Sequence, residues 1–290
     1  MANLRVIRKR IGSVKSTQQI TKAMKMVSAA KLKRAQAAIV AARPYARKMR
    51  EVVQSLAARA GEEAHPLLAA RETKKLALLV VTTDRGLCGG FNSNLLRATN
   101  RFLAGNREKY EEIAVFAVGR KARDFFRRRG VSIRKEYLNM LGSLSYTHSA
   151  RLSEELVGGF LAGDFDEVQV VFNEFRSAIS QSVRFEKLFP ISVDPAEAKD
   201  AAAGIDFLYE PSQKEILAAL IPRYVETQLF RVLLESVAGE HGARMTAMDS
   251  ATNNAVDMIS RLTLQMNRAR QATITKELME IIGGAEALKG

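Results

Sequence analysis

The chain of 290 residues has no tryptophan, one cysteine and no long apolar run. The single cysteine, Cys88, excludes an internal disulfide and a cysteine-rich metal site, which suits a reducing compartment. Runs such as residues 76–81 are far too short to span a bilayer. Residues 1–5 lack the apolar region of a signal peptide, and we expect no transit peptide. We therefore expect a soluble protein that is not exported.

Proline is also scarce, and it is absent after Pro222. From Phe230 to Ala272, mostly apolar residues recur in alternating steps of four and three, as in the seam of a coiled coil. The seam is Phe230, Leu234, Val237, His241, Arg244, Met248, Ala251, Ala255, Met258, Leu262, Gln265, Ala269 and Ala272. A helix of roughly 60 residues is on the order of 90 Å long, so it must protrude from an ordinary domain and needs a partner helix.

Residues 1–59 supply that partner, because they contain many helix formers, one glycine and no proline before Pro44. The four-three rhythm starts there and then resumes on a shifted register, which predicts a stutter. The first set is Ile7, Ile11 and Val14, and the second is Ile20, Met24, Val27 and Ala30. We expect residues 1–59 to pair with residues 212–286 as an antiparallel coiled coil.

The second helix has a start signal in Ser212, with Glu215 at the capping-box position. Pro222 should bend this helix or divide it from a short leading one. Gly239 and Gly242 permit close approach of another backbone.

Acidic residues are nearly missing from the first 59 positions. Fifteen Lys and Arg stand against the single acid Glu51, which accounts for the whole net charge of +14. A solvated helix face is one explanation. So lopsided a charge favours an acidic partner, and nucleic acid, anionic lipid and an acidic protein surface all fit.

Residues 75–206 have a different period. Apolar runs at residues 76–83, 113–118, 131–133, 167–172 and 179–185 predict strands, and residues 94–103, 121–129 and 149–161 predict helices between them. Strands alternating with helices predict a mostly parallel sheet, covered on its faces and joined by right-handed crossovers. The fold class is therefore α/β plus a long coiled coil, with a central Rossmann-like domain.

A glycine-rich turn follows the first strand, where a doubly wound sheet would place a phosphate. It contains Asp84, Arg85, Gly86, Gly89 and Gly90. The turn has no lysine and matches neither the P-loop nor the dinucleotide fingerprint, so a structural or partner-contacting turn is favoured over a nucleotide site. The histidines, His65, His148 and His241, lack metal spacing, and we expect no catalytic residue, metal or cofactor.

Four strings carry a family resemblance along essentially the whole chain. They are residues 13–27 (SVKSTQQITKAMKMV), 84–92 (DRGLCGGFN), 251–255 (ATNNA) and 267–275 (NRARQATIT). Together, and in this order, they resemble the gamma subunit of F-type ATP synthase, in a bacterial form.

The resemblance implies a non-catalytic rotor subunit. In that family the paired terminal helices form the central stalk, which transmits rotation of the membrane c-ring to the catalytic beta subunits and couples proton translocation to ATP synthesis or hydrolysis. The partners implied are the alpha and beta subunits, the epsilon subunit and the c-ring, with no nucleic acid. The implied location is peripheral, on the cytoplasmic face of the inner membrane, and membrane association is indirect.

The resemblance also assigns contact residues. Met24 and Lys25 would face the acidic lever of a beta subunit. The surrounding ring would meet Arg268, Gln271, Thr275 and Glu277, although many relatives have glutamine where this chain has Lys276. Tyr209 and Glu210 would lie at the junction of head and stalk.

Two other functions fit parts of the sequence. A nucleic-acid-binding coiled coil would explain the basic first helix, and it predicts salt-dependent binding without protein partners. A Rossmann-type enzyme with a helical stalk predicts a ligand near Gly86–Gly90. Reconstitution with alpha and beta subunits distinguishes both from a rotor.

Overall fold

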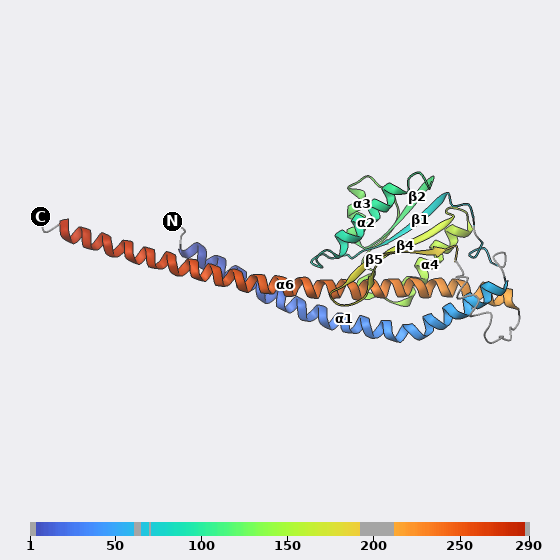
Figure 1. The fold of residues 1–290 in the computed structure, drawn as a ribbon, viewed down its shortest axis with the longest axis horizontal. Helices are drawn as coiled ribbons and strands as arrows, with labels where there is room; N and C mark the ends of the chain where they lie inside the picture. Colours follow the sequence, from blue (N-terminus) through green and yellow to red (C-terminus); the bar gives the residue numbers. More distant parts are fainter. Residues whose placement is uncertain (1–3, 61–64, 70, 192–211, 288–290) are drawn as a thin grey trace. The chain divides into compact units, whose positions relative to one another are not determined.

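The computed structural model describes residues 4–60, 65–69, 71–191 and 212–287 (Figure 1). Its elements are α1 (Leu4–Ala60), β1 (Lys75–Val81), α2 (Phe91–Gly105), β2 (Glu112–Val118), α3 (Arg120–Arg127), β3 (Ile133–Tyr137), the 3-10 turn η2 (Leu141–Ser143), α4 (Tyr146–Leu161), β4 (Glu167–Phe175), β5 (Gln181–Phe189) and α6 (Gln213–Ala287). Contacts divide the chain into a terminal unit, Met1–Ser28 with Met245–Gly290, and a head unit, Ala29–Arg244. Both long helices contribute to both units.

The head unit is built on a five-stranded sheet in the order β3-β2-β1-β4-β5. The first four strands are parallel, and β5 returns antiparallel to β4 as a hairpin. Parallel strands require crossover connections, which the helices between them provide. The expected α/β fold with a central doubly wound sheet is confirmed.

The central strand β1 is buried on both faces, because its side chains alternate between two cores. Leu76, Leu78 and Val80 pack with residues of α2 and α3. Ala77, Leu79 and Val81 pack with α4 and with the head-unit parts of α1 and α6. This two-sided burial explains the unbroken apolar run in the sequence.

The long helices meet the sheet as part of the core of the head unit. Val53 and Leu56 of α1 and Leu229 and Leu233 of α6 belong to the same cluster as β1. Gly239 of α6 faces Phe91, whose ring would lie 2.9 Å from a Cβ added at this glycine. Gly242 faces the Ala178 carbonyl oxygen, which would lie 3.0 Å from an added Cβ. These glycines let α6 approach α2 and the β4–β5 hairpin, rather than a second long helix.

Two helix predictions can be compared directly with α6. Ser212 Oγ accepts the Glu215 N–H at 3.3 Å and donates to the Glu215 carboxylate at 3.1 Å, which confirms the N-cap. Pro222 does not divide the helix, since α6 continues through it from Gln213 to Ala287. The helix expected over residues 149–161 is present but starts earlier, because α4 begins at Tyr146 after the Ser145–His148 capping box.

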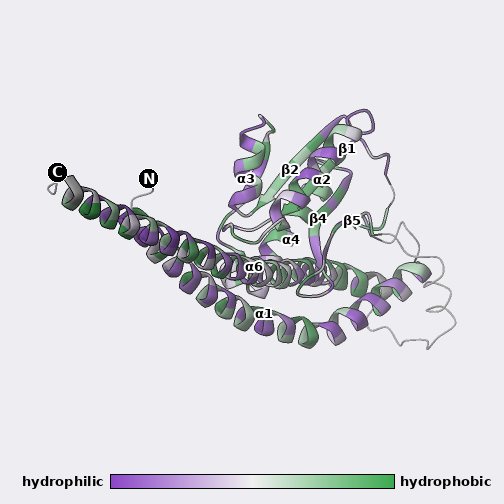
Figure 2. Ribbon diagram, turned by 60° about the vertical axis from the view of Figure 1, so that its left-hand side comes forward, coloured by the Kyte–Doolittle hydropathy of each residue, from purple (hydrophilic) through white to green (hydrophobic). Residues whose placement is uncertain are grey.

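The expected stutter in α1 is wrong. Buried or half-buried positions follow one unbroken four-three rhythm: Leu4, Ile7, Ile11, Val14, Gln18, Thr21, Lys25, Ser28, Leu32, Ala35, Ile39, Ala42, Ala46, Met49, Val53 and Leu56. Ile20 and Val27 are instead 60% and 56% exposed. Polar side chains hold the seam where apolar ones were expected, and Figure 2 shows α1 striped with hydrophilic and hydrophobic residues.

The seam predicted for α6 is half right in the terminal unit. Met248, Ala255 and Leu262 are buried as expected, whereas Met258, Gln265 and Ala272 are exposed. The alternate positions are taken by Thr252, Ile259, Met266 and Thr273, which are half-buried. A four-three rhythm can be placed in two phases on the same apolar residues, and the structure selects the other phase.

The two helices run antiparallel within each unit. In the terminal unit, Thr252 Oγ1 donates to Thr21 Oγ1 at 2.8 Å, and Lys25 Nζ lies 2.6 Å from Asp249 Oδ1. Residue numbers rise on α1 as they fall on α6, which confirms the antiparallel coiled coil. Among the described residues, no helix is long and apolar enough to cross a membrane.

Candidate functional site

The residues expected at the site fall into two groups, one on the terminal helices and one in the turn after β1. Tyr209 and Glu210, the expected junction residues, lie outside the described residues. The two groups lie on different elements of the fold.

The turn from Asp84 to Gly90 lies at the carboxyl end of β1. Asp84 Oδ1 accepts the backbone N–H of Arg120 at 3.1 Å and that of Asn139 at 3.0 Å. Arg120 is the first residue of α3, so this carboxylate occupies the helix N-terminus where a phosphate would otherwise bind. The protein's own side chain fills the anion position.

The rest of the turn is closed by Asn92 and shaped by unusual backbone angles. Asn92 accepts the Thr83 N–H at 3.1 Å and donates to Thr83 Oγ1 at 2.9 Å. Leu87 and Gly89 have φ of 63° and 56°, the left-handed region that glycine adopts without strain. Arg85 is exposed, and its carbonyl accepts from Thr83 Oγ1 at 2.5 Å.

The turn is attached to α6 by a residue that sequence reasoning placed in the coiled-coil seam. Arg244 Nη2 donates to the Gly86 carbonyl at 3.2 Å and lies 2.6 Å from Glu240 Oε1. Because 158 positions separate Gly86 from Arg244, no spacing rule could have connected them. The glycine turn therefore contacts the long helix, while Gly89 and Gly90 stay exposed.

Cys88 and His148, two reactive side chains weighed from the sequence, have structural surroundings. No group of three or more His, Cys, Asp and Glu among them could bind a metal ion. Cys88 is buried, and this burial raises the pKa of its thiol, which opposes nucleophilic use. His148 caps α4 by accepting the Ser145 N–H at 3.1 Å, so its role is structural.

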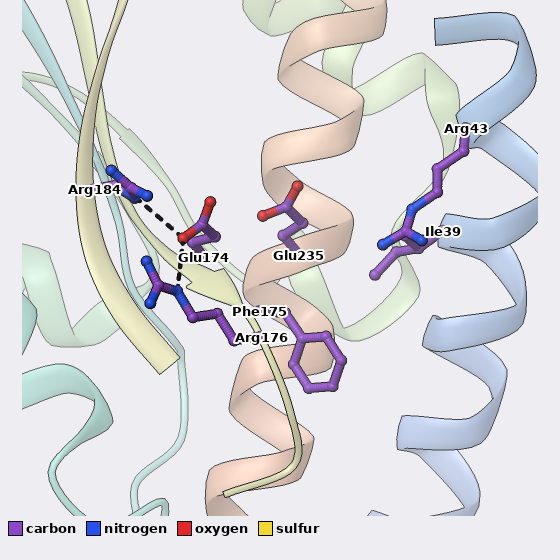
Figure 3. A pocket seen from close by; sticks show the side chains of 7 residues that line it. All are labelled: Ile39, Arg43, Glu174, Phe175, Arg176, Arg184 and Glu235. Carbon is purple, nitrogen blue, oxygen red and sulfur yellow. Dashed lines mark hydrogen bonds and ion pairs between the residues drawn. The ribbon is translucent and has the colours of Figure 1, made fainter. Parts of the chain in front are cut away.

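One cavity, of about 270 Å³, lies between the β4–β5 hairpin and the long helices of the head unit (Figure 3). Arg176 and Arg184 both donate to Glu174, at 3.2 and 3.1 Å. In Figure 3, Glu235 of α6 lies between Glu174 on the hairpin and Arg43 on α1. Since Glu174 already engages two of the three arginines, the cavity does not present a set of unpaired cations to a nucleotide.

On the terminal helices, the expected contact residues lie in two separate regions, one on α1 and one on α6. Met24 is half-buried, and Lys25 pairs with Asp249. Arg268, Gln271, Thr275 and Glu277 are all exposed on α6. From Asp249 to Arg268 is 19 residues, roughly 28 Å along a helix.

The four α6 residues do not share one face. Arg268, Gln271 and Thr275 are spaced by three and four, so they form one stripe. Glu277 is two residues beyond Thr275 and points to another side of the helix. Lys276 lies 3.4 Å from Glu280, an exposed pair one turn apart.

Sequence reasoning missed an exposed apolar face on α1. Ile20, Met24 and Val27 follow helical spacing, and Ile20 and Val27 are more than half exposed. The C-terminal part of α6 also exposes apolar side chains, namely Ile274, Leu278, Met279, Ile281 and Ile282. The four-three rhythm of Ile7, Ile11 and Val14 continues through the polar residues Gln18, Thr21, Lys25 and Ser28. Following it would have predicted that Ile20 and Val27 are exposed.

These features together define a helical stalk protein: paired terminal helices with exposed side chains, and an α/β domain whose phosphate position is filled by Asp84. Residues 3–288 match the family model described as ATP synthase. The chain belongs to the ATP synthase gamma-chain family, as the sequence motifs predicted.

The relatives cover the whole chain. The ATP synthase gamma chain of Trichlorobacter lovleyi is 53% identical over 290 residues, and that of Anaeromyxobacter sp. (strain K) is 55% identical over 292, each covering 100% of both chains.

Solved structures share the fold. A chain of the Euglena gracilis mitochondrial ATP synthase (OSCP/F1/c-ring, rotational state 3) has a TM-score of 0.68 at 21% identity, covering 98% of this chain and 94% of that one. A chain of the Tetrahymena thermophila central stalk/c-ring structure has a TM-score of 0.62 at 24% identity, covering 80% and 99%.

Proposed function

We propose that this chain is the central-stalk rotor of a bacterial ATP synthase. It transmits rotation of the membrane c-ring to the catalytic beta subunits, and so couples proton translocation to ATP synthesis or hydrolysis. It is a stalk subunit and not itself catalytic. Its partners are the alpha and beta subunits, the epsilon subunit and the c-ring, at the cytoplasmic face of the inner membrane.

The observation that carries the proposal is the uneven surface of the terminal unit. On α1, the apolar residues Ile20 and Val27 are more than half exposed, and Lys22 is exposed on another side of the same helix. On α6, the stripe of Arg268, Gln271 and Thr275 is polar. A rotor can shift the state of a surrounding subunit only if its contacts differ between orientations, and an uneven surface provides such a difference.

The contacts must also release at each step. Exposed ion pairs contribute about 0.2–1 kcal/mol each, so basic side chains of α1 can meet an acidic segment of beta without trapping it. We assign such a contact to Lys25, and the assignment is supported by the more than 40% exposure of both side chains in its pair with Asp249. Met24 adds an adaptable apolar contact next to it.

The head unit would contact the epsilon subunit and the c-ring. Its sheet carries the large core, which includes side chains of both long helices, and its glycine turn bonds to α6. Tyr209 and Glu210 remain proposed as the junction residues.

Reconstitution tests the function. Mixing the chain with alpha and beta subunits should give a three-way complex whose ATPase activity depends on the chain. Tight nucleic-acid binding at physiological salt without such a complex would instead support a nucleic-acid-binding coiled coil.

Met24→Lys tests the contact site in the complete enzyme. The added charge near the acidic lever should lower the number of protons pumped per ATP hydrolysed while hydrolysis continues. Gln36→Lys, an exposed change on α1 within the head unit, is the matched control and should leave coupling unchanged. Equal pumping per ATP in Met24→Lys and parent would refute the assignment of Met24.

A further inference from the structure

The last turns of α6 in the head unit hold a buried ion pair that also reaches the glycine turn. Arg244 is 8% exposed and Glu240 is 9% exposed. Arg244 Nη2 lies 2.6 Å from Glu240 Oε1 and donates to the Gly86 carbonyl at 3.2 Å. One guanidinium therefore joins a helix carboxylate to the backbone of a distant turn.

Two glycines bring the same stretch of α6 against the α/β domain. A Cβ at Gly239 would lie 2.9 Å from the Phe91 ring, and one at Gly242 would lie 3.0 Å from the Ala178 carbonyl oxygen. Phe91 begins α2 directly after the turn, and Ala178 lies between β4 and β5. Residues 239–244 thus touch the α/β domain at three separate points.

The electrostatics favour a fixed arrangement of this cluster. A buried carboxylate and a buried guanidinium each lose hydration, and removing one partner leaves the other uncompensated. Lys31 of α1 and Asp84 of the turn also act on Glu240, and His241 Nδ1 lies 3.5 Å from Arg244 Nη1. The Arg244 guanidinium is therefore shared among Glu240, His241 and the Gly86 carbonyl.

We propose that Glu240, Arg244 and the Gly86 carbonyl form a clamp that fixes the rotational position of α6 against the α/β domain. Arg244 is the last residue of the head unit, so the clamp lies where the head-unit part of α6 ends. Glu240 and Arg244 are then positioning residues for torque transfer, and this role rests on the proposed rotor function.

The first test measures the clamp without the rest of the enzyme. Hydrogen exchange of the backbone amides at residues 87–91 is compared in the full chain, Arg244→Lys and Arg244→Gln. Loss of a charge-assisted hydrogen bond should speed exchange by about tenfold. Arg223→Gln, an exposed arginine of α6 in the same unit, should leave it unchanged. Unchanged exchange in both Arg244 variants would overturn the clamp.

The second test uses the reconstituted complex in vesicles. Arg244→Lys keeps a cation beside Glu240 but removes the guanidinium hydrogen bond to the Gly86 carbonyl. We expect ATP hydrolysis close to that of the parent and protons pumped per ATP reduced, with a larger reduction for Arg244→Gln. If Arg244→Gln does not assemble, Arg244→Lys decides. A merely structural role would lower hydrolysis and pumping together.

The two proposals fail differently. A parent complex that neither assembles nor pumps would remove the rotor function itself. A parent that couples normally, with Arg244→Lys and Arg223→Gln coupling equally well, would remove only the clamp.

Discussion

In the head unit, α6 buries six large aliphatic side chains to 2% exposure or less: Leu217, Ile221, Val225, Leu229, Val232 and Leu233. In the described part of the terminal unit, the same helix buries Met248, Ala255 and Leu262, and α1 adds Ile7. The remaining α1 seam there includes Thr21 and Lys25, which bond to α6 through polar groups. One pair of helices is therefore packed in two different ways along its length.

The head unit therefore supplies most of the packing that stabilises the fold, whereas the terminal unit keeps apolar surface exposed for contacts. Fully burying a large aliphatic side chain contributes about 1.5–3 kcal/mol. The head unit collects such contributions because a sheet lies under its helices. The terminal unit has only the facing helix to pack against, so much of its apolar surface stays available to other subunits.

The strongest way to break the comparison is to remove a core side chain. Leu233→Ala, at a position with 0% exposure, should lower the free energy of unfolding by about 2–5 kcal/mol, because it leaves a cavity in the head core. Leu264→Ala, at a position 53% exposed on the same helix, should change it by at most about 0.5 kcal/mol. Denaturant unfolding checks both, and equal losses would contradict the comparison.

The effect of a Gly→Ala substitution on stability should have opposite signs in the two units. Gly239→Ala places a Cβ 2.9 Å from the Phe91 ring, and overpacking of this kind costs about 1–3 kcal/mol. Gly12→Ala, in α1 of the terminal unit, meets no atom within 4 Å and should stabilise the helix by about 0.5–1 kcal/mol. Thermal melts of both variants provide the measurement, and a stabilising Gly239→Ala would show that α6 does not approach the α/β domain closely.

His241 of the head unit should make the folding stability depend on pH. Burial, followed by the charges of Arg244 and Lys31, lowers the pKa of His241 from 6.5 to about 4. The unfolded chain therefore takes up a proton that the folded chain resists, so stability present above pH 6.5 is lost as the pH falls from 6.5 to 4.

His241→Gln isolates this contribution. Unfolding midpoints between pH 7.5 and 4 should fall less in the variant than in the parent. Glu240 acts in the opposite direction, because burial raises its pKa, but it is present in both proteins. Parallel curves would mean that His241 is accessible to protons in the folded state.

The sequence predicted the sheet well because burial on both faces leaves a continuous apolar run, as in β1. It misplaced the seam of α1 because Gln18, Thr21 and Lys25 are polar, and periodicity arguments assign seams to apolar residues. The prediction therefore placed Ile20 and Val27 in the seam, although they are exposed. The error fell on residues proposed to touch other subunits, where outward-facing apolar side chains are expected.

The site was predictable only where it is local. The glycine turn is visible in nine residues, but its anion position is filled through Arg120 and Asn139, 36 and 55 residues beyond Asp84. The Arg244 contact spans 158 residues. Such contacts follow from how the sheet and the helices pack, and no spacing along the chain encodes them.

The smallest effect should come from the terminal unit. Lys25 and Asp249 lie 2.6 Å apart, with side chains 42% and 47% exposed, and such pairs contribute about 0.2–1 kcal/mol. A double-mutant cycle with Lys25→Gln and Asp249→Asn should give a coupling energy in this range that shrinks at high salt. A coupling above about 2 kcal/mol that resists salt would mean a rigid pair, unable to exchange Asp249 for a carboxylate of another subunit. A weak pair leaves Lys25 able to change partners as the rotor turns, because the helix loses little stability when the contact breaks.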